Sequence, residues 1–364
     1  TRITPQPLFE FFIIIWITFH GLFCCGVLPV NAIVRYVLQF TTYYSVSRRC
    51  RVWCPICGNK ESKKFLSKVC LTSKEEYDLV ECYSCESRYF SPMPEIDEIV
   101  SFYEGVFWGE DEVKQIGKGA AFARLYLSSG QSLNEKPKFL DVGCASGFFL
   151  KGVQEQSNWD CHGIEINPEL ATHARDKLAL KIHTGTLDNA PFDKGSFDYI
   201  HLRDIVEHVT QPLEFLLSCR QFLKPDGRVY LSIPNGYIDS IGLIEFYQNH
   251  KVKARSPNGH LYFFNKSSLE LLLSKAGFGI ASSGTYGIKY GLRALGYLPR
   301  KSTWSKSYDS RELWGNSEGF IAVKGTNKPL SYHIWKMFWH RWLMYRGLLK
   351  VGLDFELILK PINT

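Results

Sequence analysis

The sequence predicts a doubly wound α/β fold, in which helices cover both faces of a mostly parallel seven-stranded sheet. Three observations favour it: strand-like and helix-like segments alternate from residue 136 onward, a glycine-containing turn joins the first strand to the first helix, and an acidic residue ends the second strand. This alternation is typical of parallel sheets with helical crossovers. The 364 residues also leave room for a second, smaller unit.

Seven short apolar segments have the length and composition of strands. They are 138–142, 161–166, 180–183, 197–202, 228–233, 279–285 and 319–323. Helices are expected at 148–156, 168–178, 212–223 and 267–276, because Pro168 and Pro212 suit a first helical turn and Gly277 suits a C-cap. A turn is expected at 224–227, and 236–264 interrupts the pattern as an inserted loop or lid. The α/β domain therefore spans 136–325.

Composition excludes few classes of function. Hydrophobic residues make up 45% of the chain and charged residues 22%, which is enough for a packed core. The net charge of +7 is small for this length, so it is weak evidence for nucleic acid and fits an anionic membrane surface equally well. Of the eleven cysteines, four form two CxxC pairs and the rest are scattered. This pattern predicts a reducing, cytoplasmic compartment and one metal site.

Residues 1–50 form an apolar N-terminal segment. Residues 11–30 contain no Asp, Glu, Lys or Arg, and about 20 apolar residues suffice to cross a bilayer. Arginines are more numerous downstream, so a membrane anchor would leave the rest of the chain on the cytoplasmic face. The alternatives are a signal peptide, which fits poorly with reduced CxxC pairs, and a segment that does not fold with the domain.

The two CxxC pairs, Cys54/Cys57 and Cys82/Cys85, predict a zinc ribbon at 51–94. Four thiolates can enclose one Zn²⁺ in a closed tetrahedral site of the structural kind. The 24 residues between the pairs exceed the usual roughly 15–20, so a β-hairpin between them is expected. The alternatives are four unrelated reduced cysteines or a redox pair. Residues 95–135 are expected to form a helical linker or cap.

The turn after the first strand is typical of a cofactor site. Asp141 ends the strand, Gly143 permits a tight turn, and Gly147 lets a ligand approach the N-terminus of the next helix. Glu165 ends the second strand, where an acid can accept hydrogen bonds from ribose hydroxyls. The alternative is a glycine turn that only packs the helix on the sheet. A dehydrogenase site is disfavoured because the G-x-G-x-x-G spacing is absent.

Asp141-Val142-Gly143-Cys144-Ala145-Ser146-Gly147 resembles the first motif of the class I S-adenosylmethionine-dependent methyltransferases, with Ala145 where glycine is frequent. Residues 191–200, 205–209 (Ile-Val-Glu-His-Val) and 223–227 resemble their later motifs. Residues 260–264 and 276–278 resemble the ubiquinone-biosynthesis O-methyltransferase-like branch, many of whose members carry a similar cysteine ribbon.

The resemblance implies S-adenosylmethionine as cofactor and a set of residues that bind it. They are Asp141, Gly143, Cys144, Ala145, Gly147, Glu165, Ile166, Thr186, Leu187 and Arg203. Thr186 departs from the pattern, because the branch usually has an Asp beside the adenine there. Thr186 could still hydrogen-bond, or Asp188 could substitute for the Asp.

The residues after the fourth strand are candidates for catalysis. His208 is the first candidate for a general base, with Asp204 and Glu207 close enough in sequence to orient it. His260, in the insertion, is the second. The alternative is that His208 only packs and hydrogen-bonds the loop. Asn235 lies in Ile-Pro-Asn-Gly rather than Asn/Asp-Pro-Pro-Tyr, which argues against a DNA substrate.

Residues 326–364 combine aromatic and basic side chains at helical spacing. Such a helix either lies in a membrane interface or docks on the core or on a second subunit. The expected function is O-methylation of a small-molecule, lipid-linked or glycan-linked acceptor. Two alternatives remain: a non-catalytic zinc-ribbon protein that binds a partner, and an RNA methyltransferase, for which no dense basic patch is seen.

Overall fold

The computed structural model describes residues 49–50, 53–72, 74–103, 112–128, 136–249, 256–286 and 354–362. The chain divides into two units, Thr1–Ser47 and Arg48–Thr364, and all described residues belong to the second. The apolar segment 11–30, the expected strand 319–323 and most of the aromatic tail lie outside the described residues. Within the described ranges, no helix is long and apolar enough to span a membrane.

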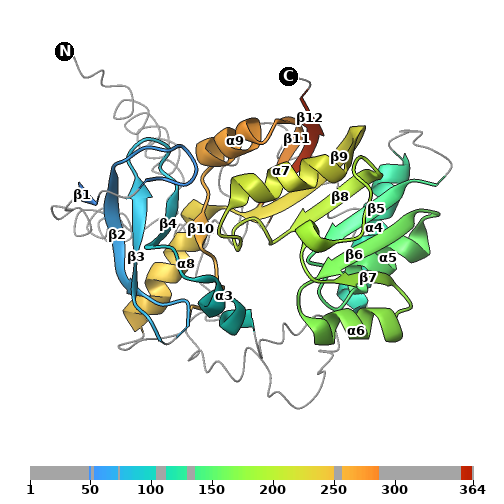
Figure 1. The fold of residues 1–364 in the computed structure, drawn as a ribbon, viewed down its shortest axis with the longest axis horizontal. Coiled ribbons are helices and arrows are strands. Elements are labelled where there is room, and N and C mark those ends of the chain that lie inside the picture. The colour runs from blue at the N-terminus through green and yellow to red at the C-terminus, as the bar shows by residue number, and fades with distance from the viewer. Residues whose placement is uncertain are drawn as a thin grey trace, which may run out of the picture. The chain divides into compact units, whose positions relative to one another are not determined.

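The larger sheet has seven strands in the order β11-β12-β9-β8-β5-β6-β7 (Figure 1). Its members are β5 (Lys138–Val142), β6 (Asp160–Glu165), β7 (Lys181–Thr184), β8 (Phe197–Arg203), β9 (Leu223–Pro234), β11 (Phe278–Tyr286) and β12 (Asp354–Pro361). The strands from β5 to β9 pair in parallel, whereas β11 and β12 are antiparallel. The predicted fold class is confirmed, and the carboxyl ends of the parallel strands share one edge.

Two apolar clusters fill the two faces of this sheet. Neighbouring residues of a strand point to opposite faces, and Phe139 and Leu140 of β5 accordingly belong to different clusters. Phe139 packs with Phe122 and Val153, which lie on α4 (Glu112–Ser128) and α5 (Phe148–Gln156). The cluster of Leu140 includes residues of α7 (Pro212–Phe222) and α9 (Lys266–Lys275). Helices therefore cover both faces, as the alternation predicted.

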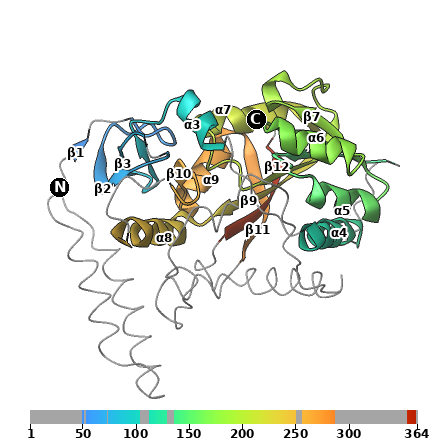
Figure 2. The ribbon, with the colours of Figure 1, turned by 90° about the horizontal axis from the view of Figure 1, so that it is seen from below.

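Helices α4 and α5 cross at close range (Figure 2). A Cβ added to Gly119 of α4 would lie 2.0 Å from the carbonyl oxygen of Phe149, and one added to Gly152 of α5 would lie 2.1 Å from that of Ile116. The two backbones touch because neither helix carries a side chain at the crossing. α4 belongs to the segment expected to be a helical linker, as does α3 (Ile96–Tyr103).

Two sequence expectations need correction. β9 begins at Leu223, so residues 224–227 are an irregular part of this strand and not a separate turn; a register shift after the Phe197–Leu223 pair accommodates the extra residues. The expectation of a helical C-terminal tail is wrong for Asp354–Pro361, which forms β12 between β9 and β11. Pairing on both sides outweighs any local helical preference there.

A smaller antiparallel sheet contains the cysteine segment. Its order is β1-β2-β3-β4-β10, with β1 (Arg49–Cys50), β2 (Ser62–Val69), β3 (Tyr77–Cys82), β4 (Arg88–Ser91) and β10 (Tyr262–Phe263). β2 and β3 form the hairpin expected between the two CxxC pairs. β10 and α8 (Gly236–Asn249) come from the segment expected to be an insertion. β10 pairs with β4, so this segment is built onto the cysteine-bearing sheet.

Candidate active site

The loop between β5 and α5 has the backbone geometry of a tight cofactor turn. Gly143, Ala145 and Gly147 all have positive φ, at 71°, 48° and 81°. The N–H of Gly147 donates to the carbonyl of Cys144 at 2.9 Å, and α5 begins directly afterwards. A Cβ at Gly143 would lie 2.2 Å from Ile205 Cδ1, so a side chain there would require Ile205 to move and would be strained by the positive φ, at the point where this loop meets the loop after β8.

Glu165 connects this loop to the end of β6. Its buried carboxylate accepts hydrogen bonds from the backbone N–H groups of Ala145 and Asn167, each at 2.8 Å. Burial raises the pKa of Glu165, and the two hydrogen bonds oppose that rise. Each carboxylate oxygen has a second lone pair. Glu165 can therefore fix the loop and still accept hydrogen bonds from ribose hydroxyls.

Asp141 has a partner that the sequence did not indicate. Its Oδ1 lies 2.6 Å from Nδ1 of His201 on β8, and both side chains are buried. The His201 ring stacks on Phe149 and Tyr230 at centroid distances of 4.4 and 5.3 Å. This packing fixes the rotamer of Asp141. The histidine belongs to an apolar strand, and only the parallel pairing of β5 with β8 brings it beside Asp141.

The other residues expected at the cofactor also lie at or beside this edge. Ile166 is exposed at 57% just after β6, and Cys144 is buried in the loop. Thr186 donates its backbone N–H to Oδ1 of Asn189 at 3.0 Å, which orders the turn after β7, and Leu187 behind it is buried. Arg203 ends β8. Their roles in binding stay predictions.

The second group of interest combines Glu207 and His208, which follow β8, with His260, which precedes β10. Glu207 Oε1 lies 3.9 Å from Nε2 of His208 and 3.9 Å from Nε2 of His260. The backbone carbonyl of Glu207 accepts from the N–H groups of Leu261 and Tyr262 at 2.9 and 3.2 Å. His208 and His260, which are far apart in the sequence, are thus brought together, the first from the loop after β8 and the second from the inserted segment.

Each histidine of the cluster is held through its Nδ1. Nδ1 of His208 lies 2.7 Å from the hydroxyl of Tyr103 and 3.2 Å from the carbonyl of Gly259. The expectation that Asp204 orients His208 is not met, because Asp204 is half exposed and lies 3.6 Å from Arg203 Nε.

His260 is held by residues of the inserted segment. Nδ1 of His260 lies 2.7 Å from Asp239 Oδ2 and 2.9 Å from Asn258 Nδ2. Asn258 also donates to the other oxygen of Asp239 at 3.0 Å. Tyr103, Asp239 and Asn258 come from α3, α8 and the loop before β10, and no sequence spacing links them to the histidines.

Burial governs the charges of this cluster. Glu207 is 1% exposed, and neither carboxylate oxygen accepts a hydrogen bond from the described residues. Burial and the nearby charge of Asp204 raise the pKa of Glu207 well above its usual range. Burial and the neighbouring His260 lower the pKa of His208 to about 3. His208 is therefore neutral at pH 7, with Nε2 directed toward Glu207.

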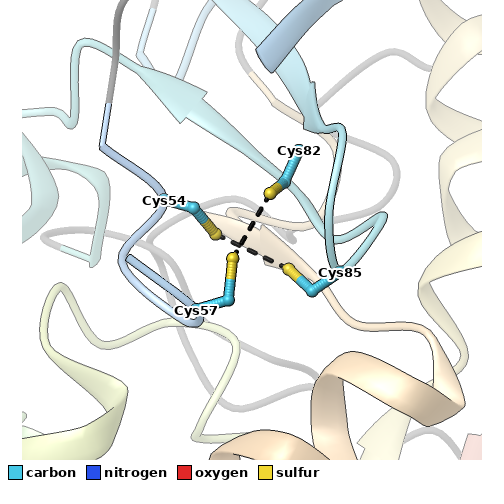
Figure 3. A group of neighbouring side chains, drawn as sticks. All are labelled: Cys54, Cys57, Cys82 and Cys85. Atoms are coloured by element: carbon cyan, nitrogen blue, oxygen red, sulfur yellow. Dashed lines mark hydrogen bonds between the residues drawn. The ribbon is translucent and has the colours of Figure 1, made fainter. Parts of the chain in front are cut away.

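The four cysteines of the CxxC pairs converge on one point (Figure 3). Cys54 Sγ lies 3.6 Å from Cys85 Sγ, and Cys57 Sγ lies 3.4 Å from Cys82 Sγ. Four thiolates around a tetrahedral Zn²⁺, with Zn–S bonds near 2.3 Å, would be about 3.8 Å apart. The arrangement matches this spacing to within a few tenths of an ångström, so the residues fit a zinc ion.

Comparison with known proteins gives the class of this fold and site. Residues 116–283 match the family described as "Methyltransferase domain". That range includes the loop after β5, Glu165 and the cluster of Glu207, His208 and His260. This part of the chain is a methyltransferase domain of the class I S-adenosylmethionine-dependent kind, as the motifs between β5 and β9 indicated.

Individual relatives carry different names. The ubiquinone biosynthesis O-methyltransferase of Caulobacter vibrioides is 25% identical over 177 residues, which cover 47% of this chain and 67% of that protein. The phosphoethanolamine N-methyltransferase of Plasmodium falciparum is 25% identical over 160 residues, or 42% of this chain and 59% of that protein. A solved SAM-dependent methyltransferase of Archaeoglobus fulgidus is 16% identical, with a TM-score of 0.38, and the match covers 66% of this chain and 92% of that one.

Proposed function

We propose that this methyltransferase methylates a hydroxyl oxygen of a small-molecule, lipid-linked or glycan-linked acceptor. In this reaction the hydroxyl loses its proton, the oxygen forms a bond to the methyl carbon, and the bond from that carbon to the sulfonium breaks to leave S-adenosylhomocysteine. Positioning of the two reactants supplies much of the rate, and removal of the proton supplies a further factor of roughly 10²–10⁴.

The observation that carries the proposal is the cluster of Glu207, His208 and His260. It follows β8, at the edge of the parallel sheet where ligands of open α/β folds bind. Its groups are proton acceptors or cation ligands, which a hydroxyl needs in order to become a nucleophile. A neutral amine already has a free lone pair and needs no such group. The cluster therefore favours oxygen over nitrogen, although relatives of both kinds exist.

The proposal includes a structural Zn²⁺ held by Cys54, Cys57, Cys82 and Cys85. Its role would be to brace the acceptor side of the site. Three hydrogen bonds support this: Phe90 N–H to the Leu261 carbonyl at 3.2 Å, Asn265 Nδ2 to the Cys85 carbonyl at 2.9 Å, and Lys275 Nζ to the Ile56 carbonyl at 2.6 Å. Leu261 directly follows His260, so the hydrogen bond from Phe90 connects the ribbon to the segment that carries one histidine of the cluster.

The test is transfer of a labelled methyl group from S-adenosylmethionine to a panel of acceptors. The panel contains phenols, prenylated phenols and sugar nucleotides as hydroxyl acceptors, and phosphoethanolamine as an amine acceptor. We expect label in at least one hydroxyl acceptor, and a large loss of kcat in His260→Gln with cofactor binding retained. Transfer to the amine alone, unaffected by His260→Gln, would overturn the proposal.

Contact with a membrane remains part of the proposal through residues 11–30 and the aromatic tail. A lipid-linked acceptor would be reached most easily by an enzyme held at the cytoplasmic face of the membrane. Binding to RNA is the less favoured alternative, and strongly salt-dependent binding to RNA would support it instead.

A further inference from the structure

We propose that His201 is a positioning residue of the cofactor site, which holds the loop between β5 and α5 in its ligand-binding form through contacts at both ends of the loop. His201 acts through Asp141 and Phe149 rather than on the reacting atoms. The proposal rests on the predicted role of this loop in binding S-adenosylmethionine and not on the identity of the acceptor. Binding of the cofactor can be measured without an acceptor, so this proposal and the proposed hydroxyl methylation can fail separately.

The contacts of His201 lie on both sides of the loop. Before the loop, Nδ1 of His201 lies 2.6 Å from Oδ1 of Asp141. After the loop, the ring of Phe149 in the first turn of α5 stacks on the imidazole, with the centroids 4.4 Å apart and the planes at 10°. The loop residues 143–147 therefore begin and end next to the same side chain. A displaced or missing imidazole would release both ends together.

The register of the sheet and the packing around the ring fix where His201 lies. It is paired with Asp141 across β5 and β8, and with Tyr230 across β8 and β9. The Tyr230 ring also stacks on the imidazole, at 5.3 Å and 20°, and Phe122 of α4 lies against it edge-on at 5.6 Å. His201 is 2% exposed. An imidazole enclosed in this way cannot rotate without displacing its neighbours, so the core sets the position of Nδ1 relative to Asp141.

The hydrogen bond between His201 and Asp141 has a defined direction. A carboxylate only accepts hydrogen bonds, so Nδ1 carries the proton and donates it to Oδ1. Hydrogen bonds to an ionised acceptor are shorter and stronger than neutral ones, which agrees with the distance of 2.6 Å. Oδ2 of Asp141 keeps its lone pairs for a ligand or for the loop. His201 thus holds the carboxylate at the end of β5 in one orientation.

The loop requires such support because its backbone conformation is unfavourable. Ala145 has a φ of 48°, in the left-handed region that residues with a side chain disfavour. Glu165 holds the middle of the loop by accepting a hydrogen bond from the Ala145 N–H at 2.8 Å. His201 holds the two ends from β8. A loop fastened at its middle and at both ends is already in place when the ligand arrives, which lowers the ordering cost of binding.

Two variants of similar size separate the hydrogen bond from the packing. His201→Asn retains an N–H close to the position of Nδ1, whereas His201→Leu has no donor, and both lose the ring. If His201 only filled the core, Leu would be the better replacement, because burying an amide costs more than burying an alkyl group. A residue that acts on Asp141 requires the opposite order. Tyr199→Leu is the matched control, because Tyr199 lies on the same strand and face but pairs with Phe139 instead of Asp141.

The measurement is calorimetric titration of the zinc-loaded full chain with S-adenosylmethionine, with urea unfolding of each variant to show that it is folded. We expect His201→Leu to raise Kd by roughly tenfold and His201→Asn by less than about threefold, because a hydrogen bond to a charged group separates them. Tyr199→Leu should lower stability but leave Kd within about twofold. In an Asp141→Asn background, the difference between His201→Leu and His201→Asn should shrink to less than about twofold, because the two residues act as one unit.

Hydrogen exchange of the cofactor-free protein gives a second readout, which does not depend on the ligand. The backbone N–H groups of Ala145 and Gly147 are hydrogen-bonded. Both should exchange faster in His201→Leu than in wild type, because the loop then opens locally. Their exchange in Tyr199→Leu should stay close to that of wild type.

Three results would overturn the proposal. They are equal affinity of folded His201→Asn and His201→Leu, an effect of His201→Leu that persists undiminished in the Asp141→Asn background, and wild-type protein that binds no cofactor. If neither His201 variant folds, NMR of wild-type protein labelled in its histidine nitrogens decides the matter. The proposal requires a proton on Nδ1 of His201 whose signal moves in Asp141→Asn, and a His201 protonated on Nε2 alone would overturn it.

Discussion

The crossing of α4 and α5 makes Gly119→Ala a sharp test of the packing behind the cofactor loop. Within a helix, replacing glycine by alanine normally stabilises by roughly 0.5–1 kcal/mol. Gly119 is buried, however, and its added Cβ would lie 2.0 Å from Phe149 O and 2.9 Å from Val153 N. The intrinsic preference and the packing therefore predict opposite signs.

The distances indicate which effect is larger. Carbon and carbonyl oxygen do not ordinarily approach closer than about 3.3 Å, so the helices must separate by more than ~1 Å at this point. Both clashing atoms at Gly119 are backbone, and no rotamer change can relieve them. Overpacking typically costs about 1–3 kcal/mol. We expect Gly119→Ala to lower the free energy of unfolding by about 1–2 kcal/mol after the gain in helix preference.

The assay is urea unfolding of the zinc-loaded full chain, with Val113→Ala as the control. Val113 is exposed at 47% in the same helix, so its replacement should change stability by less than ~0.5 kcal/mol. Gly152→Ala clashes at the same crossing, and the double variant should lose less than the sum of the two because one separation relieves both contacts. A Gly119→Ala protein more stable than wild type would refute the close crossing.

Three further predictions concern other parts of the chain. Cys85→Ser should lower the zinc content from one per chain toward zero and speed the hydrogen exchange of amides in the cysteine-bearing sheet. The reason is that metal binding can supply on the order of 10 kcal/mol to the folding of a small ribbon. Unchanged zinc content and unchanged hydrogen exchange would contradict this prediction. Asp198→Asn should destabilise by about 1–3 kcal/mol in thermal unfolding, because the buried carboxylate accepts from Lys224 Nζ through both oxygens at 2.8 Å; an unchanged Tm would show that this pair contributes nothing. Removal of residues 1–47 should move the protein from the membrane fraction to the soluble one, and the membrane-anchor hypothesis fails if the distribution stays the same.

Much of the large sheet could be predicted from the sequence because its signals are local. Proline at the first turns of α6 (Pro168–Asp176) and α7, the apolar runs of β5 and β8, and the glycines of the cofactor loop act within a few residues of themselves. β12 could not be placed in the same way. It follows a long segment outside the described residues, and only pairing with β9 and β11 defines it as a strand.

The candidate site shows the same contrast between residues that local signals mark and residues that only long-range contacts bring into place. Asp141, Glu165 and His208 are marked by their positions at strand ends and by motif resemblance. Their partners are not: His201 reaches Asp141 through parallel pairing, and Tyr103 reaches His208 from α3. These two pairs are 60 and 105 positions apart in the chain, and no periodicity or spacing in the sequence indicates such contacts. Only the folded structure reveals them.

The most direct test of the central claim is calorimetric titration of the zinc-loaded protein with S-adenosylmethionine and S-adenosylhomocysteine, beside Asp141→Ala and Glu165→Ala. Glu165 ties the loop after β5 to β6 through two backbone hydrogen bonds, so its loss removes both a cofactor acceptor and the support of the loop. We predict micromolar binding of both ligands by the wild type, and at least tenfold weaker binding by each variant. Absence of binding by folded wild-type protein would contradict the assignment of this edge of the sheet as the cofactor site.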